Sequence, residues 1–143
     1  MRIAVHLTER VMFCWPATYW TELIKKLTDA GHDLYALSDE TNVSNASQNP
    51  RLHDRLHLSD EESRKVIAEC DVFIGPPLKY HDMAKELGVK TIALLGATLK
   101  GDGVRTTTVC GGCLDKLDNK VDCNWGDEIC YYEILPNDVI AAL

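Results

Sequence analysis

Residues 71–96 read DVFIGPPLKYHDMAKELGVKTIALLG, in which two apolar runs flank an amphipathic segment. The runs Val72–Gly75 and Thr91–Leu95 are short and bounded by polar residues or glycine, which is typical of buried strands. The segment between them has the spacing of a short helix that ends at Gly88. Its predicted buried side consists of Met83, Ala84 and Leu87. A strand–helix–strand unit of this kind indicates a parallel sheet.

The same alternation continues toward the N-terminus. Ile3–Leu7 and Leu34–Leu37 are apolar runs that predict two further strands. Apolar residues between them recur at the spacing of one side of a helix, and Pro16 and Gly31 suit the two ends of that helix. The stripe consists of Trp20, Leu23, Ile24 and Leu27.

The remaining segments connect or extend these units. Residues 39–55 are polar and predict a surface loop, after which Ser59 and Glu62 form a capping box. The helix that this box starts is expected to run to about Cys70. Another short helix is expected over residues 136–143.

Together these elements predict an α/β fold: a single Rossmann-like parallel sheet with helices on both faces, plus an irregular Cys-rich C-terminal tail. Residues 1–105 are expected to form the Rossmann-like domain. Residues 106–143 are expected to form a four-cysteine tail and a short C-terminal helix packed on the same domain. In such sheets, ligands bind at the carboxyl ends of the strands.

The composition narrows the classes of partner. The 143 residues are 45% hydrophobic and 26% charged, with a formal net charge of −7 at pH 7. This charge argues against nucleic-acid binding, which requires clustered Lys and Arg side chains. The apolar run at the N-terminus is too short for a signal sequence or a membrane span. We therefore expect a cytoplasmic protein with no nucleic-acid partner and no membrane span.

Four of the six cysteines gather in the tail, at Cys110, Cys113, Cys123 and Cys130. Four thiolates can surround a zinc ion tetrahedrally, and a CxxC turn places two of them on one side of the metal. A structural zinc site is therefore one interpretation, and two disulfides or thiols that only pack are the alternatives. Cys14 and Cys70 are expected to be buried thiols.

Two loops at predicted strand ends carry residues that suit parts of a nucleotide. Thr8, Glu9 and Arg10 follow the first strand, where a hydroxyl and a guanidinium can hold a phosphate. A salt-linked surface turn is the alternative interpretation of these residues. Glu40 follows the second strand, where an acidic residue can meet a ribose.

A third loop begins at Gly75, between a strand and its helix. Lys79 and His81 are expected to add positive charge at the start of this helix, where the N–H groups and the dipole attract anions. Two prolines in the loop remove N–H donors. A surface or capping histidine is the alternative interpretation of His81.

These motifs occur in the order found in glycosyltransferase family 9, the heptosyltransferase-like enzymes. Residues 15–23 (WPATYWTEL) resemble the Trp-Pro helix entry of the family, and residues 30–34 (AGHDL) resemble its second strand. Residues 81–98 (HDMAKELGVKTIALLGAT) resemble its conserved helix–strand segment. Residues 70–75 (CDVFIG) and the ending at residues 134–139 (ILPNDV) are similar to it as well.

The resemblance covers nearly the whole chain and corresponds to the C-terminal, nucleotide-sugar-binding half of these two-domain GT-B enzymes. It implies that Thr8, Glu40 and His81 keep ligand positions. The Asp-Ser/Thr-Gly phosphate motif of the family falls at residues 77–79, which read Pro-Leu-Lys. Residues 13–14 (Phe-Cys) stand where the family often has a basic residue before Trp-Pro. The N-terminal acceptor-binding domain of the family has no counterpart in the sequence.

Two functions follow as hypotheses. The first is a glycosyltransferase-related domain that binds a nucleotide sugar while a separate partner supplies the acceptor-binding half. The second is a non-catalytic interaction or assembly module derived from a glycosyltransferase half, with a protein partner or a second copy of itself. Without the phosphate motif, the resemblance to transferases does not imply independent turnover, because transition-state stabilisation depends on contacts to the diphosphate.

Overall fold

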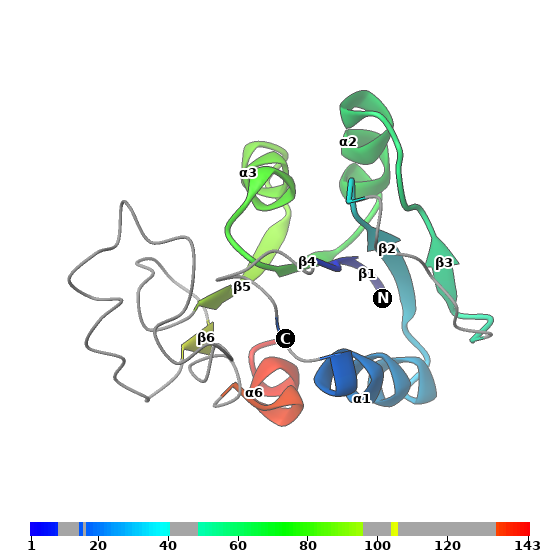
Figure 1. Ribbon diagram of the computed structural model, residues 1–143, viewed down its shortest axis with the longest axis vertical. Helices are drawn as coiled ribbons and strands as arrows, with labels where there is room; N and C mark the ends of the chain where they lie inside the picture. Colours follow the sequence, from blue (N-terminus) through cyan, green and yellow to red (C-terminus); the bar gives the residue numbers. More distant parts are fainter. Residues whose placement is uncertain (9–14, 16, 41–48, 96–103, 106–133) are drawn as a thin grey trace.

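The computed structural model describes residues 1–8, 15, 17–40, 49–95, 104–105 and 134–143. These residues form a six-stranded sheet in which every strand pairing is parallel and the order is β3-β2-β1-β4-β5-β6 (Figure 1). The strands are β1 (Arg2–His6), β2 (Asp33–Leu37), β3 (Leu52–Asp54), β4 (Val72–Gly75), β5 (Lys90–Leu95) and β6 (Val104–Arg105). The helices are α1 (Ala17–Asp29), α2 (Asp60–Ala68), α3 (Lys79–Glu86) and α6 (Pro136–Ala141). The predicted α/β fold with a parallel sheet is confirmed.

Helices cover both faces of the sheet, as predicted. α1 and α6 lie together on one face, whereas α2 and α3 lie together on the other (Figure 1). Each face has its own apolar core. On the first face Ile3 packs with Leu23 of α1, and on the second Phe73 packs with Tyr80 of α3. Strands buried on both sides need apolar residues at nearly every position, which explains their continuous apolar runs.

The helix ends follow local sequence signals. α1 and α3 end just before Gly31 and Gly88, whose φ angles of +95° and +74° belong to the left-handed region that favours glycine. At the start of α2, the backbone N–H of Glu62 donates to the Ser59 hydroxyl at 3.2 Å, as predicted for an N-cap. In a capping box the Glu62 carboxylate would accept from the backbone N–H of Ser59. Here it accepts from the Ser59 hydroxyl instead, at 3.0 Å.

Two predictions about these elements are wrong. Residues 39–55 are not a loop throughout, because Leu52–Asp54 form the edge strand β3 beside β2. In this strand only Leu52 is buried, so no apolar run marks it in the sequence. Leu87, expected on the buried side of α3, is instead 40% exposed at the C-cap of the helix, and Tyr80 is buried at 1% exposure.

Trp15 joins the C-terminal segment to the region of α1. Its indole N–H donates to the backbone oxygen of Ile134 at 2.9 Å, and its ring meets the ring of Trp20 edge-on with centroids 4.9 Å apart. Lys26 of α1 also donates to the side chain of Asn137 in α6 at 2.8 Å. These contacts hold α6 against α1.

Candidate functional site

The strand order reverses between β1 and β4. β1 pairs with β2 on one side and with β4 on the other, so the connections that leave β1 and β4 run in opposite directions. Residues 7–8 follow β1, residues 38–40 follow β2, and residues 76–78 follow β4. In doubly wound sheets, this reversal at the carboxyl edge is where ligands bind. The predicted ligand-binding loops therefore start at the expected edge of the sheet.

His6 and Gly75 pack against each other at the ends of β1 and β4. His6 is 2% exposed, and its ring meets the ring of Tyr80 edge-on with centroids 4.7 Å apart. A Cβ atom on Gly75 would lie 2.8 Å from the Cβ atom of His6, so a larger residue does not fit. The two strand ends and the first turn of α3 are thus tightly packed next to the carboxyl edge.

Lys79, the first residue of α3, forms two ion pairs. Its Nζ atom lies 2.8 Å from Oδ2 of Asp39, after β2, and 3.0 Å from Oδ1 of Asp60, at the start of α2. The hydrogen bond from Lys79 holds the pKa of Asp39 below its ordinary value, and the same bond raises the pKa of Lys79. Lys79 is therefore charged at neutral pH, with two carboxylates in direct contact with its ammonium group.

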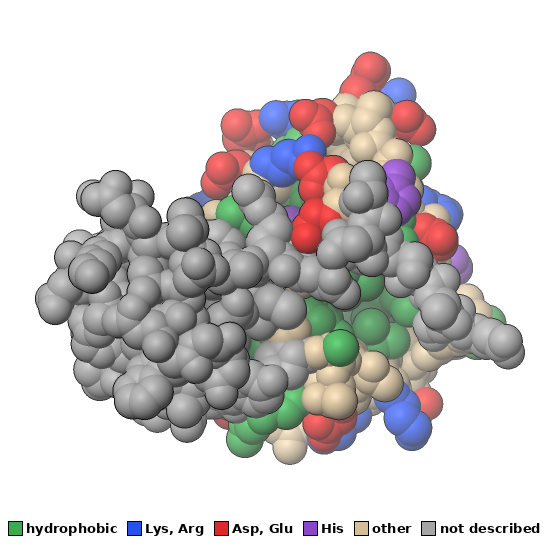
Figure 2. Space-filling view, viewed as in Figure 1, with side chains coloured by type: hydrophobic (Ala, Val, Ile, Leu, Met, Phe, Trp, Pro, Cys, Tyr) green, Lys and Arg blue, Asp and Glu red, His purple; other side chains and the backbone are tan. Residues whose placement is uncertain are grey.

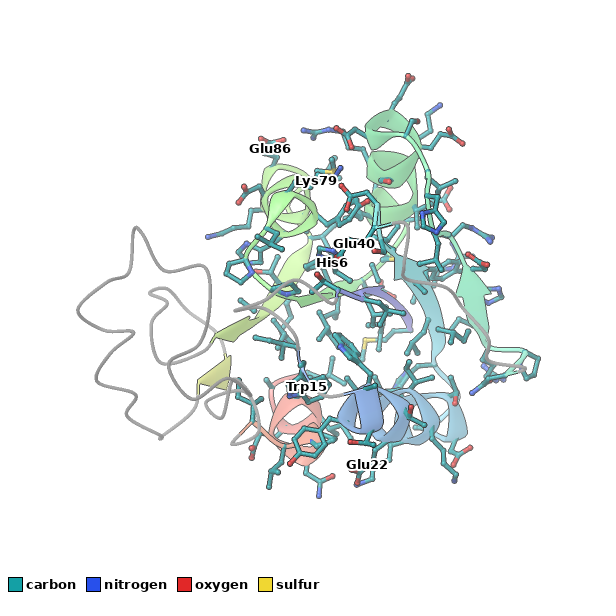
Figure 3. The ribbon with its side chains drawn as sticks, in the orientation of Figure 1. His6, Trp15, Glu22, Glu40, Lys79 and Glu86 are labelled. Atoms are coloured by element: carbon teal, nitrogen blue, oxygen red, sulfur yellow. The ribbon has the colours of Figure 1, made fainter. Side chains whose placement is uncertain are left out.

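The end of β2 brings a second acidic residue to this region. Ser38, which is 1% exposed, accepts a hydrogen bond from the backbone N–H of Glu40 at 3.2 Å. Glu40 directly follows Asp39, whose carboxylate pairs with Lys79, and Figure 3 draws it on the side of the sheet that α2 and α3 cover. Thr8, the second residue after the end of β1, is 4% exposed. The structure thus brings Glu40 and Lys79 into one region.

His81 lies in the first turn of α3 with a mostly enclosed ring. Its side chain is 10% exposed, and its ring centroid lies 6.3 Å from that of Phe73. Burial lowers the pKa of His81 below its ordinary value of 6.5, and the charge of Lys85 acts in the same direction. The neutral form of the ring is therefore favoured at pH 7, and Lys79 rather than His81 supplies the positive charge expected at the start of this helix. A neutral imidazole can still donate or accept a hydrogen bond.

The start of α3 can receive an anion. The first N–H groups of a helix have no partner within the helix, and Leu78 at the N-cap makes no side-chain hydrogen bond to them. The helix dipole adds partial positive charge at this end. The full charge of Lys79 lies beside these groups, but Asp39 and Asp60 offset it. The arrangement favours a ligand that combines an anionic group with hydroxyl groups, since the latter can donate to carboxylates.

Neither a metal site nor a membrane span is found in the described part of the chain. Its His, Cys, Asp and Glu residues form no group of three or more that could hold a metal ion. None of its helices combines the length and the apolar character that crossing a bilayer requires. The four tail cysteines lie outside the described residues, so the zinc site stays a prediction. Glu9, Arg10 and Cys14 also lie outside them.

Four residues of this site are not singled out by the sequence analysis: His6, Asp39, Asp60 and Tyr80. His6 is a polar residue within an apolar run, and this is the one sequence signal that marks it. Asp60 shows only as an acidic residue in the first turn of a helix, which is a common feature. Its pairing with Lys79 depends on the packing of α2 beside α3.

Comparison with known proteins gives a fold likeness. No protein-family model matches the chain, and no curated protein sequence matches it. TibC from enterotoxigenic E. coli H10407, a bacterial iron-containing dodecameric glycosyltransferase, has a TM-score of 0.76 at 14% identity over 98% of this chain. E. coli ADP-heptose LPS heptosyltransferase II has a TM-score of 0.73 at 17% identity over 98% of the chain. E. coli heptosyltransferase WaaC with ADP-2-deoxy-2-fluoro heptose has a TM-score of 0.71 at 18% identity over 98% of the chain.

The chain spans less than half of each of these proteins: 43% of TibC, 44% of heptosyltransferase II and 42% of WaaC. TibC has also been solved in complex with ADP-D-β-D-heptose. At these identities the likeness shows the fold alone. The chain has the Rossmann-like fold of a glycosyltransferase half.

Proposed function

We propose that the chain is a glycosyltransferase-related domain that binds a nucleoside-diphosphate sugar at the carboxyl edge between β1 and β4. The observation that carries this proposal is the reversal of strand order at that point, with the start of α3 and the end of β2 beside it. The fold likeness to TibC and WaaC, which were solved with ADP-sugars, supports an ADP-linked sugar as the first ligand to test.

The diphosphate and the ribose of the ligand each have a matching group at this edge. The N–H groups at the start of α3 receive the diphosphate, and Thr8 donates to the same phosphates from the loop after β1. Glu40 accepts hydrogen bonds from the ribose hydroxyls at the end of β2. His81, neutral at pH 7, acts as a hydrogen-bonding group. Arg10 belongs to the same loop as Thr8 in the sequence, and we assign its guanidinium to the phosphates as well.

Glycosyl transfer also needs an acceptor site. The chain spans less than half of the heptosyltransferases that share its fold. We therefore assign the acceptor site to a further domain, in the same polypeptide or in a partner protein. The described chain supplies the donor side of such a reaction.

Calorimetric titration of the protein with ADP-sugars and UDP-sugars tests this function. We expect saturable heat with at least one of them, and weaker binding in Glu40→Gln because the variant loses an acceptor for the ribose hydroxyls. Glu40→Gln should not weaken the binding of inorganic pyrophosphate, because pyrophosphate has no ribose. Glu22→Gln is the matched control, since Glu22 lies on α1, on the opposite face of the sheet (Figure 3). Absence of heat and of thermal protection at millimolar concentrations of both sugar classes would contradict the proposal.

The second candidate is a non-catalytic assembly module. Two observations favour it: the carboxylates on Lys79 oppose a diphosphate, and Pro76 and Pro77 occupy the loop before α3. Size-exclusion chromatography with light scattering distinguishes the two. A stable assembly that binds no nucleotide sugar supports the module, whereas a monomer with transferase turnover contradicts it.

A further inference from the structure

We infer that Lys79 determines how tightly this edge holds a diphosphate, and that Asp39 and Asp60 compete with the diphosphate for its ammonium group. The three residues are called the ionic latch below. The inference rests on the proposed function, because it concerns the anion site of that function. It adds that two carboxylates of the chain itself, those of Asp39 and Asp60, lower the affinity of the site for a diphosphate.

The ionic latch joins three elements around the start of α3. Asp39 follows β2, Asp60 begins α2, and Lys79 begins α3. The Nζ atom of Lys79 lies 2.8 Å from Asp39 and 3.0 Å from Asp60, so both carboxylates are within hydrogen-bond distance at once. The same Nζ atom lies 5.2 Å from the centroid of the Tyr80 ring, which also meets the ring of His6. The amine is thus held beside the first turn of α3, where the proposed diphosphate would lie.

The contacts of the latch are partly exposed and therefore open to exchange. The side chains of Lys79, Asp39 and Asp60 are 42%, 49% and 65% exposed, so water and salt screen both ion pairs. A diphosphate bears more negative charge than either carboxylate and can replace one of them on Lys79. In the absence of an anion, two carboxylates outnumber one ammonium group, so the local charge is negative and opposes phosphate.

The direction of the mutational effects follows. In Asp39→Asn or Asp60→Asn one competitor is lost, so each variant should bind ADP about two- to five-fold more tightly than the unmodified protein. The variant that carries both substitutions should bind ADP more tightly than either single variant. Lys79→Met should bind ADP more weakly than the unmodified protein, because no ammonium group is left for the phosphates.

Simple removal of negative charge near the anion would also tighten binding, so a matched control is needed. Asp82→Asn removes the same charge from an exposed position in the first turn of α3 without touching the latch. Glu86→Gln breaks the ion pair of Arg64 and Glu86, which joins α2 to α3 at 2.7 Å; Glu86 is the last residue of α3 and Lys79 the first. We expect a smaller gain in Asp82→Asn than in Asp39→Asn, and no gain in Glu86→Gln.

The test is calorimetric titration of ADP and of inorganic pyrophosphate into the protein and these variants, with Asp39→Asn also introduced into Lys79→Met. The expected result is a gain from Asp39→Asn that largely disappears when Lys79 is replaced. A gain that persists in full without Lys79, or that Asp82→Asn matches, would show plain charge repulsion and overturn the latch.

The outcomes separate the latch from the proposed function. ADP binding that Asp39→Asn and Asp60→Asn leave unchanged contradicts the latch and leaves the function standing. Binding of pyrophosphate but not of ADP, with the expected gain in the variants, supports the latch and contradicts the nucleotide ligand. No binding of either compound, to any variant, contradicts both.

Discussion

Gly75 and His6 pack closely at the candidate site, and Gly75→Ala tests this packing. The new Cβ atom would lie 2.8 Å from Cβ of His6 and 3.1 and 3.3 Å from two ring atoms of Phe73. The Cβ atom of His6 is fixed to the backbone of β1, so no side-chain rotation relieves the contact. β1 and β4 must therefore move apart, or the end of β4 must shift.

The cost of this movement is steric. The φ angle of Gly75 is not positive, in contrast to those of Gly31 and Gly88, so alanine can adopt the backbone conformation of Gly75. Adding a methyl group to a well-packed core typically costs about 1–3 kcal/mol. We expect a loss of this size in the free energy of unfolding, measured by guanidinium unfolding as a lower midpoint with an unchanged slope.

A double-mutant cycle identifies the source of the loss. In His6→Gly the Cβ atom that meets the new methyl group is gone, so Gly75→Ala should cost less in that background than in the unmodified protein. A loss below about 0.5 kcal/mol in the unmodified protein would refute the close packing, since changes of that size are ordinary for surface positions. Equal losses in both backgrounds would refute the contact with His6.

The remaining predictions concern three buried side chains. Trp15→Phe removes the hydrogen bond to Ile134, so the free energy of unfolding should fall by about 1–3 kcal/mol in guanidinium unfolding, and no loss would contradict that bond. Because the pKa of His81 is lower in the folded state, its contribution to stability is present above pH 6.5 and lost as pH falls below it. Guanidinium unfolding at pH 7.5, 6.5 and 5.5 should show that His81→Asn loses less unfolding free energy with falling pH than the unmodified protein. An equal loss in the two proteins would contradict the lowered pKa of His81. Burial raises the pKa of Cys70 to about 12, so little of its reactive thiolate is present at pH 8. Iodoacetamide should therefore modify Cys70 at least about 100-fold more slowly in the folded than in the unfolded protein, as measured by mass spectrometry. Equal rates would contradict the burial of Cys70.

Most strands of the sheet could be predicted from the sequence because they are buried on both sides. β1, β2, β4 and β5 show as apolar runs, and α1 shows as a stripe that includes Trp20 and Leu23, both buried. β3 and β6 do not show, because they have only three and two residues and form too short an apolar pattern. Periodicity detects burial over several residues, and very short strands are defined by hydrogen bonds to their neighbours instead.

The candidate site was only partly predictable, because its contacts depend on strand order. Apolar runs predict strands but not their neighbours, so nothing in the sequence places the end of β2 beside the start of α3. The sequence therefore predicts an unpaired cation at Lys79, whereas in the structure Lys79 forms ion pairs with Asp39 and Asp60. The surface view shows red and blue side chains interleaved in the upper part of the molecule, a pattern in which single charges find partners across elements (Figure 2).

We propose that the carboxyl edge between β1 and β4 binds a nucleoside diphosphate. Titration of ¹⁵N-labelled protein with ADP, followed by amide NMR shifts, tests this proposal because the method reports where binding occurs. We predict saturable shifts at Thr8, Glu40, Gly75 and Lys79, with the amides of α1 and α6 unchanged. The absence of shifts at millimolar ADP, or shifts confined to α1 and α6, would contradict the claim.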